Sequence, residues 1–513
     1  MSPGAVAAGN PDTAAAGLAM LRAGGNAIDA AIASLMMAAV SEPMLTGPGG
    51  AGIAMVRFNG SVVVCDLFTD MPGLGRSLSS TPTMDTVQLD YGPTQQRFEV
   101  GPGAVATLGI PTGVTALHRQ FGSLPMTMLV APAVEAAEQG VVIQPGLARI
   151  LQALEPIYTR SPALSALIAP HGRPPLAGDI HRNPGLADTF RKFGTQGDAL
   201  FRTGSVAKAI LGTLGDRSLV SAADLENCSA HFRRPLRYRY RDATVWVPGV
   251  PSVAGLLVLQ ALRELEDCGP MPPALGPDQI RLMAAAMSRA ERSRGARFNR
   301  SVFMPGFEEG FLTALSPEDE GEEWLRTPLE DPSTGHTTHI STVDSHGNAV
   351  GITTSLGESC GLVAGDTGVI LNNFLGEADV NPPDVQRMAG QRLMTMCCPT
   401  LLELDDQVLV MGSGGSSRIR SAVLHGLVYL TDHRMTPSEA AAAPRAHVDG
   451  KVTSIEAEGR PEGTRELLSE ALDEVRWFDG SNMYFGGLNI AGSSDAGFIG
   501  AGDARRSGCF QIA

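Results

Sequence analysis

The sequence has few positive charges, and lysine is nearly missing from it. Lys and Arg total 39 against 54 Asp and Glu, which gives a formal net charge of −15. Lysine occurs only as Lys192, Lys208 and Lys451, so almost every cation is an arginine. Binding to nucleic-acid phosphates requires clustered basic residues. We therefore expect no nucleic-acid partner.

Cysteines are sparse and show no metal-binding spacing. Seven are scattered along the chain, including the adjacent Cys397 and Cys398, and neither a C-x-x-C motif nor a Cys/His cluster occurs. Structural zinc sites and disulfide frameworks show such spacings. We expect reduced, buried thiols of the kind found in cytoplasmic proteins, with no metal and no cofactor.

Long apolar runs are also missing. Residues 14–40 are rich in Ala, Met and Leu, but Arg22, Gly24, Gly25 and Asp29 interrupt them. A membrane span needs about 20 consecutive apolar residues. The segment predicts a buried helix pair or one long core helix. The first residues, MSPGAVAAGNPD, lack the basic and apolar regions of a signal peptide, so we expect a cytoplasmic location and no membrane partner.

A change of composition near residue 336 is the main landmark of the chain. Residues 308–335 are acidic, contain proline and have few β-branched side chains, which predicts an exposed loop. Residues 337–343 (TTHISTV) and 348–354 (NAVGITT) then predict two strands joined by a turn, and residues 368–371 a further strand. A loop that leads into a strand beginning with Thr suits chain cleavage, since the new N-terminus would lie on a rigid sheet edge.

Several short motifs follow one another in a fixed order. RAGGNAIDAA occupies residues 22–31, EPMLTGPGGAG residues 42–52, TTHISTVD residues 337–344, GVILNN residues 368–373 and GSGGSSRI residues 412–419. Together they resemble the γ-glutamyltransferase family of N-terminal-nucleophile hydrolases over nearly the whole chain. Divergent members of that family act in lincosamide and pyrrolobenzodiazepine biosynthesis.

The resemblance implies an α+β fold, a four-layer αββα sandwich built from two autoprocessed subunits. Cleavage between His336 and Thr337 would leave a large subunit, residues 1–336, and a small subunit, residues 337–513, as a heterodimer. In the precursor the Thr337 hydroxyl would attack the His336 carbonyl, giving an ester that water opens. In the mature enzyme the α-amine of Thr337 would serve as the base for its own hydroxyl.

Three further residues complete the catalytic set that the resemblance implies. Ser355 matches a hydroxyl residue that hydrogen-bonds the nucleophile, with one methyl group fewer. Gly415 and Ser416 match a pair whose backbone N–H groups form an oxyanion hole. Such donors stabilise a tetrahedral oxyanion strongly.

The substrate-binding positions depart from the family. Members grip the γ-glutamyl group with an Arg on its α-carboxylate, an Asn, a Gln and an Asp near its α-amine, and a Ser-Ser pair. In the same order this chain has Phe68, Gly357, Phe374, Glu377, Thr395 and Met396. Charge-assisted hydrogen bonds contribute about 1.5–3 kcal/mol each, so their loss predicts a different substrate. Glu377 still offers a negative charge for an amine or imine.

Three functions remain open for this small-molecule enzyme. The first is a biosynthetic hydrolase of a non-γ-glutamyl substrate, such as one that cleaves a carbon–carbon bond and releases an oxalyl unit during alkylproline formation. The second is a conventional γ-glutamyltransferase or glutathione hydrolase, and the third is a cephalosporin-type acylase. A scaffold without catalysis is disfavoured by Thr337, Ser355 and Gly415. The sequence does not decide between hydrolysis and transfer to an acceptor.

Overall fold

The computed structural model describes residues 3–76, 82–90, 95–313 and 337–513. Residues 314–336, which include most of the expected loop and His336, lie outside the described residues. The expectation of an exposed loop at residues 308–335 is wrong for residues 308–313, because helix α15 spans Phe307–Thr313. Phe307 and Phe311 of this helix pack on Phe298, which gives its apolar side a partner.

The first sheet has seven strands in the order β20-β1-β11-β12-β2-β3-β8. Neighbouring strands in it are antiparallel. Their bounds are β1 Gly4–Ala8, β2 Ala51–Phe58, β3 Ser61–Leu67, β8 His231–Arg233, β11 Thr337–Asp344, β12 Ala349–Ser355 and β20 Cys509–Ile512. Strands β11 and β12 are buried along their whole length, because they lie at the centre of this sheet.

The second sheet has six strands in the order β19-β18-β14-β13-β10-β9. Their bounds are β9 Leu236–Tyr240, β10 Ala243–Val247, β13 Thr400–Leu404, β14 Gln407–Gly412, β18 Asn489–Ser494 and β19 Gly497–Ala501. Strands β14 and β18 pack on β1, β11 and β12 of the first sheet. Small side chains, among them Ala5, Ala7, Ala349 and Ala491, fill the space between the two sheets.

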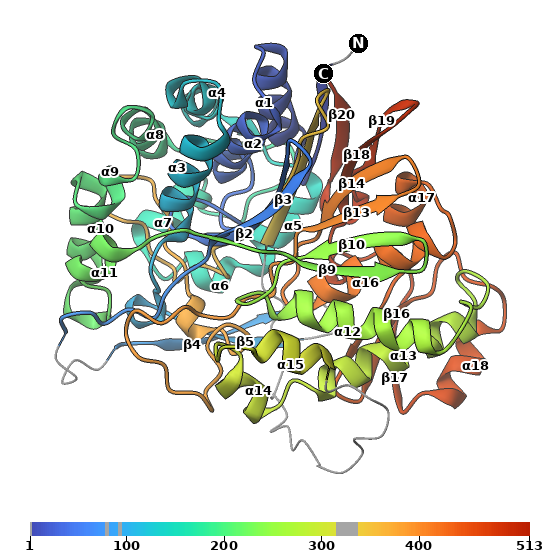
Figure 1. Ribbon diagram of the computed structural model, residues 1–513. Coiled ribbons are helices and arrows are strands. Elements are labelled where there is room, and N and C mark those ends of the chain that lie inside the picture. Colours follow the sequence, from blue (N-terminus) through green and yellow to red (C-terminus); the bar gives the residue numbers. More distant parts are fainter. Residues whose placement is uncertain (1–2, 77–81, 91–94, 314–336) are drawn as a thin grey trace.

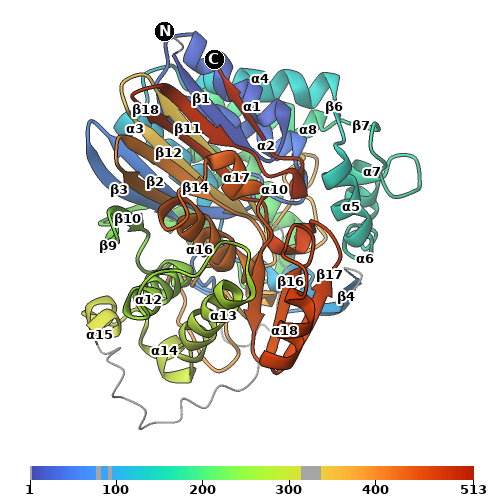
Figure 2. The same cartoon turned by 90° about the vertical axis from the view of Figure 1, so that its right-hand side faces the viewer.

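Helices cover the outer face of each sheet (Figure 1). On the first sheet these are α1 Pro11–Arg22, α2 Ala27–Ser41, α3 Gly109–Phe121, α4 Met126–Gln139 and α8 Pro184–Gln196. On the second they are α12 Val253–Asp267, α13 Pro277–Arg292 and α16 Arg418–Thr431 (Figure 2). The four layers confirm the αββα sandwich that the sequence resemblance implies.

The remaining elements lie around this sandwich. The strands form two two-stranded sheets and a three-stranded sheet: β4 Asp85–Asp90 with β5 Gln95–Val100, β6 Val141–Val142 with β7 Ile180–His181, and β15 Ala446–Asp449, β16 Val452–Glu456 and β17 Glu474–Phe478. The further α-helices are α5 Pro145–Ala153, α6 Glu155–Tyr158, α7 Pro162–Ile168, α9 Ala199–Arg202, α10 Ser205–Leu214, α11 Ala222–Asn227, α14 Ala296–Ser301, α17 Pro437–Ala442 and α18 Thr464–Ala471.

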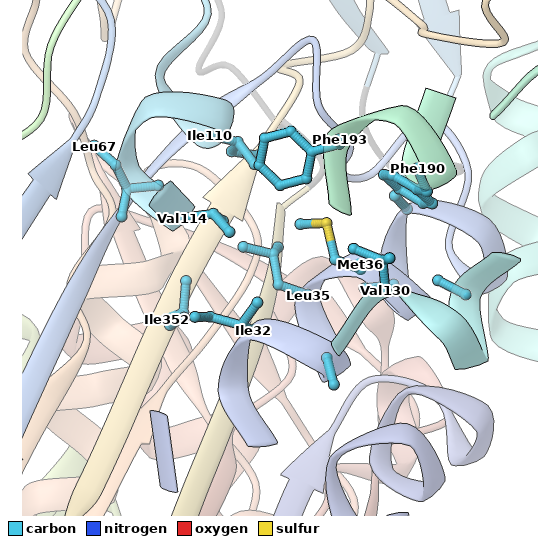
Figure 3. Packing of buried hydrophobic residues seen from close by; sticks show 14 of the residues in the cluster. Ile32, Leu35, Met36, Leu67, Ile110, Val114, Val130, Phe190, Phe193 and Ile352 are labelled. Carbon is cyan, nitrogen blue, oxygen red and sulfur yellow. The ribbon is translucent and has the colours of Figure 1, made fainter. Parts of the chain in front are cut away.

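The segment at residues 14–40 forms a helix pair and not one long helix. Gly24 adopts φ +88, a left-handed conformation that favours glycine, and the chain turns there. Asn26 then caps α2 in a capping box with Asp29. Side chains of α2, among them Ile32, Leu35 and Met36, pack against Ile352 of β12 and Val114 of α3 (Figure 3). No helix among the described residues is long and apolar enough to cross a membrane.

The predicted hairpin forms at β11 and β12, where Thr337 pairs with Ser355 in register. Asp344 closes the turn by accepting hydrogen bonds from the backbone N–H groups of His346 and Asn348. The strand expected at residues 368–371 is wrong: Ile370 makes only an isolated bridge with Val363. A β-branched run there has no neighbouring strand to pair with over its length.

Candidate active site

Thr337 opens β11 at the centre of the first sheet. Its side chain is 5% exposed, and its Oγ1 lies 3.4 Å from Oγ of Ser355, to which it donates a hydrogen bond. Ser355 Oγ also accepts the backbone N–H of Gly357 at 2.8 Å. The two hydroxyls predicted to act together are thus brought face to face at the ends of paired strands.

Hydrogen bonds on the opposite face of the sheet anchor the strand that carries Thr337. Thr338 Oγ1 donates to Glu42 Oε2 at 2.6 Å, and Thr13 Oγ1 donates to Glu42 Oε1 at 2.9 Å. Glu42 is buried, and this burial raises the pKa of its carboxyl. The sequence motif contained Glu42, but only its position under β11 reveals a role in holding Thr337.

The loop after β14 approaches the Thr337 carbonyl closely. A Cβ on Gly414 would overlap with the Thr337 carbonyl oxygen, so only glycine fits there. Gly415 follows at φ +117 and Ser416 at φ +49, and helix α16 begins at Arg418. The backbone N–H of Gly415 has no acceptor within the described part of the chain. A donor of this kind, beside a helix N-terminus, suits an oxyanion.

Glu377 and Gly357 are in direct contact. A Cβ on Gly357 would overlap with Oε1 of Glu377 and with Oδ1 of Asn373, so the absence of a side chain at residue 357 gives Glu377 its space. The Glu377 side chain is buried, and burial, with Glu358 and Asp379 nearby, raises its pKa well above the ordinary value. This environment favours the uncharged acid over the carboxylate that the sequence suggests.

A buried ion pair lies beside the oxyanion loop. Nη1 of Arg294 lies 2.6 Å from Oδ1 of Asp379, and Nη2 donates to the Asp379 carbonyl at 2.9 Å. Ser416 Oγ donates to the other carboxylate oxygen at 3.4 Å. Met396, a predicted substrate-binding residue, places its Sδ 3.9 Å from Arg294 Nη1. Neither Arg294 nor Asp379 was predicted, because no motif marks them.

The other predicted pocket residues are turned into the protein. Phe68 and Phe374 pack on each other with tilted rings whose centroids are 5.2 Å apart, and each residue is 1% exposed. Thr395 uses its hydroxyl to accept the backbone N–H of Cys397 at 3.1 Å. Two aromatic rings thus fill the volume in which the resemblance places a cation and an amide.

A cavity of about 720 Å³ adjoins the site from the side of Arg506. Its lining includes Arg149, Arg418, Tyr484 and Arg506. Nη1 of Arg506 donates to the carbonyl of Thr337 at 3.5 Å. The guanidinium carbon of Arg418, a buried residue, lies 5.0 Å from the centre of the Tyr484 ring. Arginines thus lie both at the Thr337 carbonyl and around a volume large enough for a small molecule.

No group of His, Cys, Asp and Glu among the described residues has the arrangement of a metal site. The described histidines near Thr337 serve the fold instead. His339, two residues along β11, is hydrogen-bonded to Thr353 and Ser341, and burial lowers its pKa to about 3. A neutral, fully bonded imidazole leaves the threonine without a histidine base among these residues.

Comparison with known proteins gives a single family. Residues 13–512 match the family model described as gamma-glutamyltranspeptidase. An acylase ACY 1 proenzyme from Pseudomonas sp. (strain SE83) is 30% identical over 529 residues, which covers 99% of this chain and 93% of that protein. A glutathione hydrolase proenzyme from Escherichia coli (strain K12) is 27% identical over 477 residues, covering 86% and 80%.

Solved structures show the same fold. A cephalosporin acylase from Bacillus halodurans has a TM-score of 0.80 at 23% identity and covers 100% of this chain and 96% of its own. The structure of LmbA2991HD has a TM-score of 0.78 at 22% identity and covers 99% of this chain and 98% of its own. These similarities concern the N-terminal-nucleophile hydrolase sandwich and not the substrate.

Proposed function

The chain belongs to the gamma-glutamyltranspeptidase family, and on this basis we propose that it is an N-terminal threonine hydrolase that cleaves itself before Thr337. The observation that carries the proposal is the arrangement at β11. Thr337 Oγ1 meets Ser355 Oγ at 3.4 Å, while the Thr337 carbonyl lies against Gly414 in the loop that precedes α16. A nucleophile, an orienting hydroxyl and backbone donors are the groups that attack on a carbonyl and stabilisation of its oxyanion require.

The reaction would proceed in two stages at one hydroxyl. In the precursor, Thr337 Oγ1 attacks the carbonyl of His336, and water opens the resulting ester, giving residues 1–336 and 337–513. The freed α-amine of Thr337 then takes the hydroxyl proton while Oγ1 attacks a substrate carbonyl. The N–H groups of Gly415 and Ser416 bind the oxyanion, and water releases the acyl group.

We further propose that the substrate is not a γ-glutamyl compound. Phe68 and Phe374 pack on each other where an Arg and a Gln would hold the amino acid end of glutamate, and the Glu377 environment favours a neutral acid. An unpaired substrate carboxylate against these rings would lose about 1.5–3 kcal/mol for each missing charge-assisted bond. A biosynthetic role in the cytoplasm, with hydrolysis of a carbon–carbon bond to release an oxalyl unit in alkylproline formation, is the reaction we favour.

An acylase is the second candidate. The Pseudomonas acylase ACY 1 proenzyme, 30% identical over 99% of this chain, favours it. Such an enzyme would use the same Thr337 chemistry on an amide whose acyl group carries no α-amine. Both candidates need a pocket that does not bind an ammonium group. They differ in the bond that breaks, which is a carbon–carbon bond in the first and an amide bond in the second.

Self-cleavage is tested on a denaturing gel with N-terminal sequencing. Wild-type protein should give two fragments, the smaller one beginning at Thr337. Thr337→Ser should still be cleaved, since the hydroxyl remains, and Thr337→Ala should stay one chain of 53.6 kDa. An intact wild-type chain, or a cut at another residue, would disprove the proposal.

The substrate is tested with a matched panel. γ-Glutamyl-p-nitroanilide and glutaryl-p-nitroanilide differ only in the α-amine, and a 2,4-dioxo acid contains a carbon–carbon bond whose hydrolysis yields oxalate. We expect oxalate release, with γ-glutamyl turnover at least about 100-fold lower, as loss of two charge-assisted bonds predicts. Turnover of glutaryl-p-nitroanilide alone would establish the acylase, and efficient γ-glutamyl turnover would show that the pocket still grips glutamate.

A further inference from the structure

The cavity beside the proposed nucleophile is walled by both parts of the chain. One wall is helix α5, which lies before the proposed cleavage point, and another is formed by residues 481–484 and 500–506, which lie after it. The two walls meet where the backbone N–H of Gly146 donates to Ser507 Oγ at 3.0 Å. A Cβ on Gly146 would lie 2.6 Å from that oxygen, so glycine allows the close contact. The cavity is therefore complete only when the two parts are packed together.

Arg506 connects this cavity to the nucleophile. Its Nη1 donates to the Thr337 carbonyl at 3.5 Å, and its Nη2 donates to the Met483 carbonyl at 3.1 Å. A Cβ on Gly415 would lie 3.3 Å from Nη2, so the guanidinium also lies against the proposed oxyanion loop. Gly487 leaves room for the Arg506 stem, because a Cβ there would lie 3.0 Å from Cδ. One guanidinium thus borders the nucleophilic residue, the oxyanion loop and the cavity.

The charges on the cavity lining are mainly positive. Within the lining, Arg505 and Asp503 form a buried ion pair with each other. The remaining charged lining residues are three arginines and one aspartate: Arg149, Arg418, Arg506 and Asp90. Glu42 attracts Arg506 from beneath β11 but does not belong to the lining. A surplus of guanidinium groups around a volume of about 720 Å³ attracts a small anion, although the whole chain has a net charge of −15.

Arg149 is the cation of this lining that has no protein partner. It is exposed on α5, and it makes no hydrogen bond or ion pair with any residue that the structure describes. The exposed Arg191 of α8, by contrast, pairs with Glu138. A guanidinium presents its donors as a planar fork that matches the two oxygens of a carboxylate. The fork of Arg149 can therefore bind a ligand without first breaking an ion pair.

We propose that this cavity binds a carboxylate of the substrate through Arg149 and Arg506, an inference that rests on the proposed threonine hydrolase. The acyl carbon would lie at Thr337 Oγ1, and the acid end of the same molecule would enter the cavity past Arg506. A carboxylate is favoured over a phosphate because it is the anion that the carbon chain of an acyl compound itself carries. The substrate class is then an acid with a second, reactive carbonyl, such as an oxo acid or a monoamide of a dicarboxylic acid.

This assignment agrees with the missing cation at Phe68. The resemblance places a carboxylate-binding arginine at that position, where the ring of Phe68 instead packs on Phe374. Neither phenylalanine lines the cavity. A substrate held by Arg149 and Arg506 would therefore extend from Thr337 in another direction than a γ-glutamyl group held at position 68. The enzyme would keep a preference for acids while losing its grip on glutamate.

The first experiment compares substrates that differ only in this charge. Glutaryl-p-nitroanilide and the 2,4-dioxo acid are each assayed beside their methyl esters. For the charged member that wild type turns over, Arg149→Gln should raise KM by at least about 10-fold, as loss of a charge-assisted hydrogen bond predicts, and change the KM of its ester by less than about 2-fold. Arg191→Gln, on α8 outside the lining, should change neither KM. Equal effects on acid and ester would overturn the assignment.

The second experiment measures binding and needs no turnover. Wild-type protein is titrated calorimetrically with glutarate, with its neutral analogue glutaramide and with inorganic phosphate. Glutarate should bind at least about 10-fold more tightly than glutaramide, because only glutarate offers charge-assisted hydrogen bonds. Arg149→Gln and Arg506→Gln should each weaken glutarate binding, and glutarate should inhibit turnover competitively.

The outcomes separate this inference from the proposed function. No glutarate binding, tighter binding of phosphate, unchanged binding in both variants, or inhibition that is not competitive would overturn the carboxylate site. Arg149 is exposed, so its variant should fold and keep this comparison decisive even if Arg506→Gln does not. A protein that binds glutarate as expected but neither cleaves itself nor turns over any substrate would instead refute the proposed hydrolase.

Discussion

Nη1 of Arg294 lies 2.6 Å from Oδ1 of Asp379, and Ser416 donates to the other oxygen of that carboxylate. Arg294 follows α13, before the proposed cleavage point, whereas Asp379 and Ser416 come after it. The side chains of Arg294 and Asp379 are 4% and 7% exposed. One buried ion pair therefore ties the proposed oxyanion loop to the first part of the chain.

Breaking this pair should destabilise the protein strongly. Arg294→Met would leave Asp379 charged and buried, which costs about 3–5 kcal/mol. We expect a lower midpoint of urea unfolding and slower self-cleavage. Lys192→Met removes an exposed pair with Asp188 and should change the unfolding free energy by less than about 1 kcal/mol. Similar small effects for both variants would show that the Arg294 pair does not brace the loop.

Gly414 should tolerate no side chain. In Gly414→Ala the new Cβ would overlap with the Thr337 carbonyl oxygen, a backbone atom held in the sheet. We expect a loss of about 1–3 kcal/mol, typical of overpacking, together with little or no self-cleavage. Gly212→Ala is the control, because a Cβ there meets nothing within 4 Å and lies in helix α10, where alanine is favoured. Cleavage of Gly414→Ala at the wild-type rate would contradict the assigned geometry.

The hydroxyl of Ser355 should matter more than its size. Ser355→Ala removes the acceptor for both Thr337 Oγ1 and the Gly357 N–H. A hydrogen bond contributes about 0.5–1.5 kcal/mol net, so cleavage should slow by up to about 10-fold. Ser355→Thr keeps the oxygen and should be cleaved at a rate near that of wild type. A time course on denaturing gels measures both, and equal rates for Ala and Thr variants would exclude this role.

Stability should fall as pH rises above the ordinary pKa of a glutamate. The pKa of Glu377 is raised in the folded protein, so the folded state binds more protons than the unfolded state above about pH 4.5. The unfolding free energy then decreases with pH until it passes the raised pKa. Glu377→Gln removes this contribution and should be more stable than wild type at pH 8, but not at pH 4.

Thermal unfolding of both proteins across this pH range tests the sign. Asp70, whose pKa is raised to about 6 by burial, contributes a slope of the same sign in both proteins. The informative quantity is therefore the difference in Tm between variant and wild type. A difference that stays constant with pH would mean that Glu377 titrates normally.

Phe68 should not accept the cation that the resemblance assigns to its position. Phe68 is 1% exposed and its ring packs against Phe374, so Phe68→Arg would bury an unpaired guanidinium. We expect a loss of several kcal/mol in unfolding free energy and no gain of γ-glutamyl turnover. A folded variant that hydrolyses γ-glutamyl-p-nitroanilide would mean that Phe68 borders an open pocket.

The sequence predicted what depends on local pattern and on ordered motifs. The β11–β12 hairpin followed from alternating β-branched residues around Asp344. For residues 14–40 the sequence left open a helix pair or one long helix, and the turn at Gly24 and the Asn26 cap in the structure decide for the pair. The prediction of a strand at residues 368–371 failed, since a strand also needs a neighbouring strand that no local pattern reveals. Helix α15 was missed because its acidic residues mask the few aromatic ones that pack on Phe298.

The same division holds for the site. Thr337 and Gly415 lie in motifs, and Ser355 directly follows the predicted strand at residues 348–354, so their positions were named before any geometry. Arg294 and Glu42 come from distant parts of the chain, and only folding brings them under the loop and the strand that hold Thr337. The state of Glu377 was likewise hidden, because the charge of a carboxyl depends on neighbours such as Glu358 and Asp379.

Strands from before and after residue 336 are neighbours at several places in the first sheet: β20 and β11 flank β1, and β12 pairs with β2. A cut before Thr337 would thus leave two polypeptides whose strands are hydrogen-bonded in one sheet, and separating them would require that sheet to unfold. Neither fragment would therefore exchange with the corresponding fragment of another molecule. Each enzyme would carry its two pieces in the one-to-one ratio fixed when a single chain was translated.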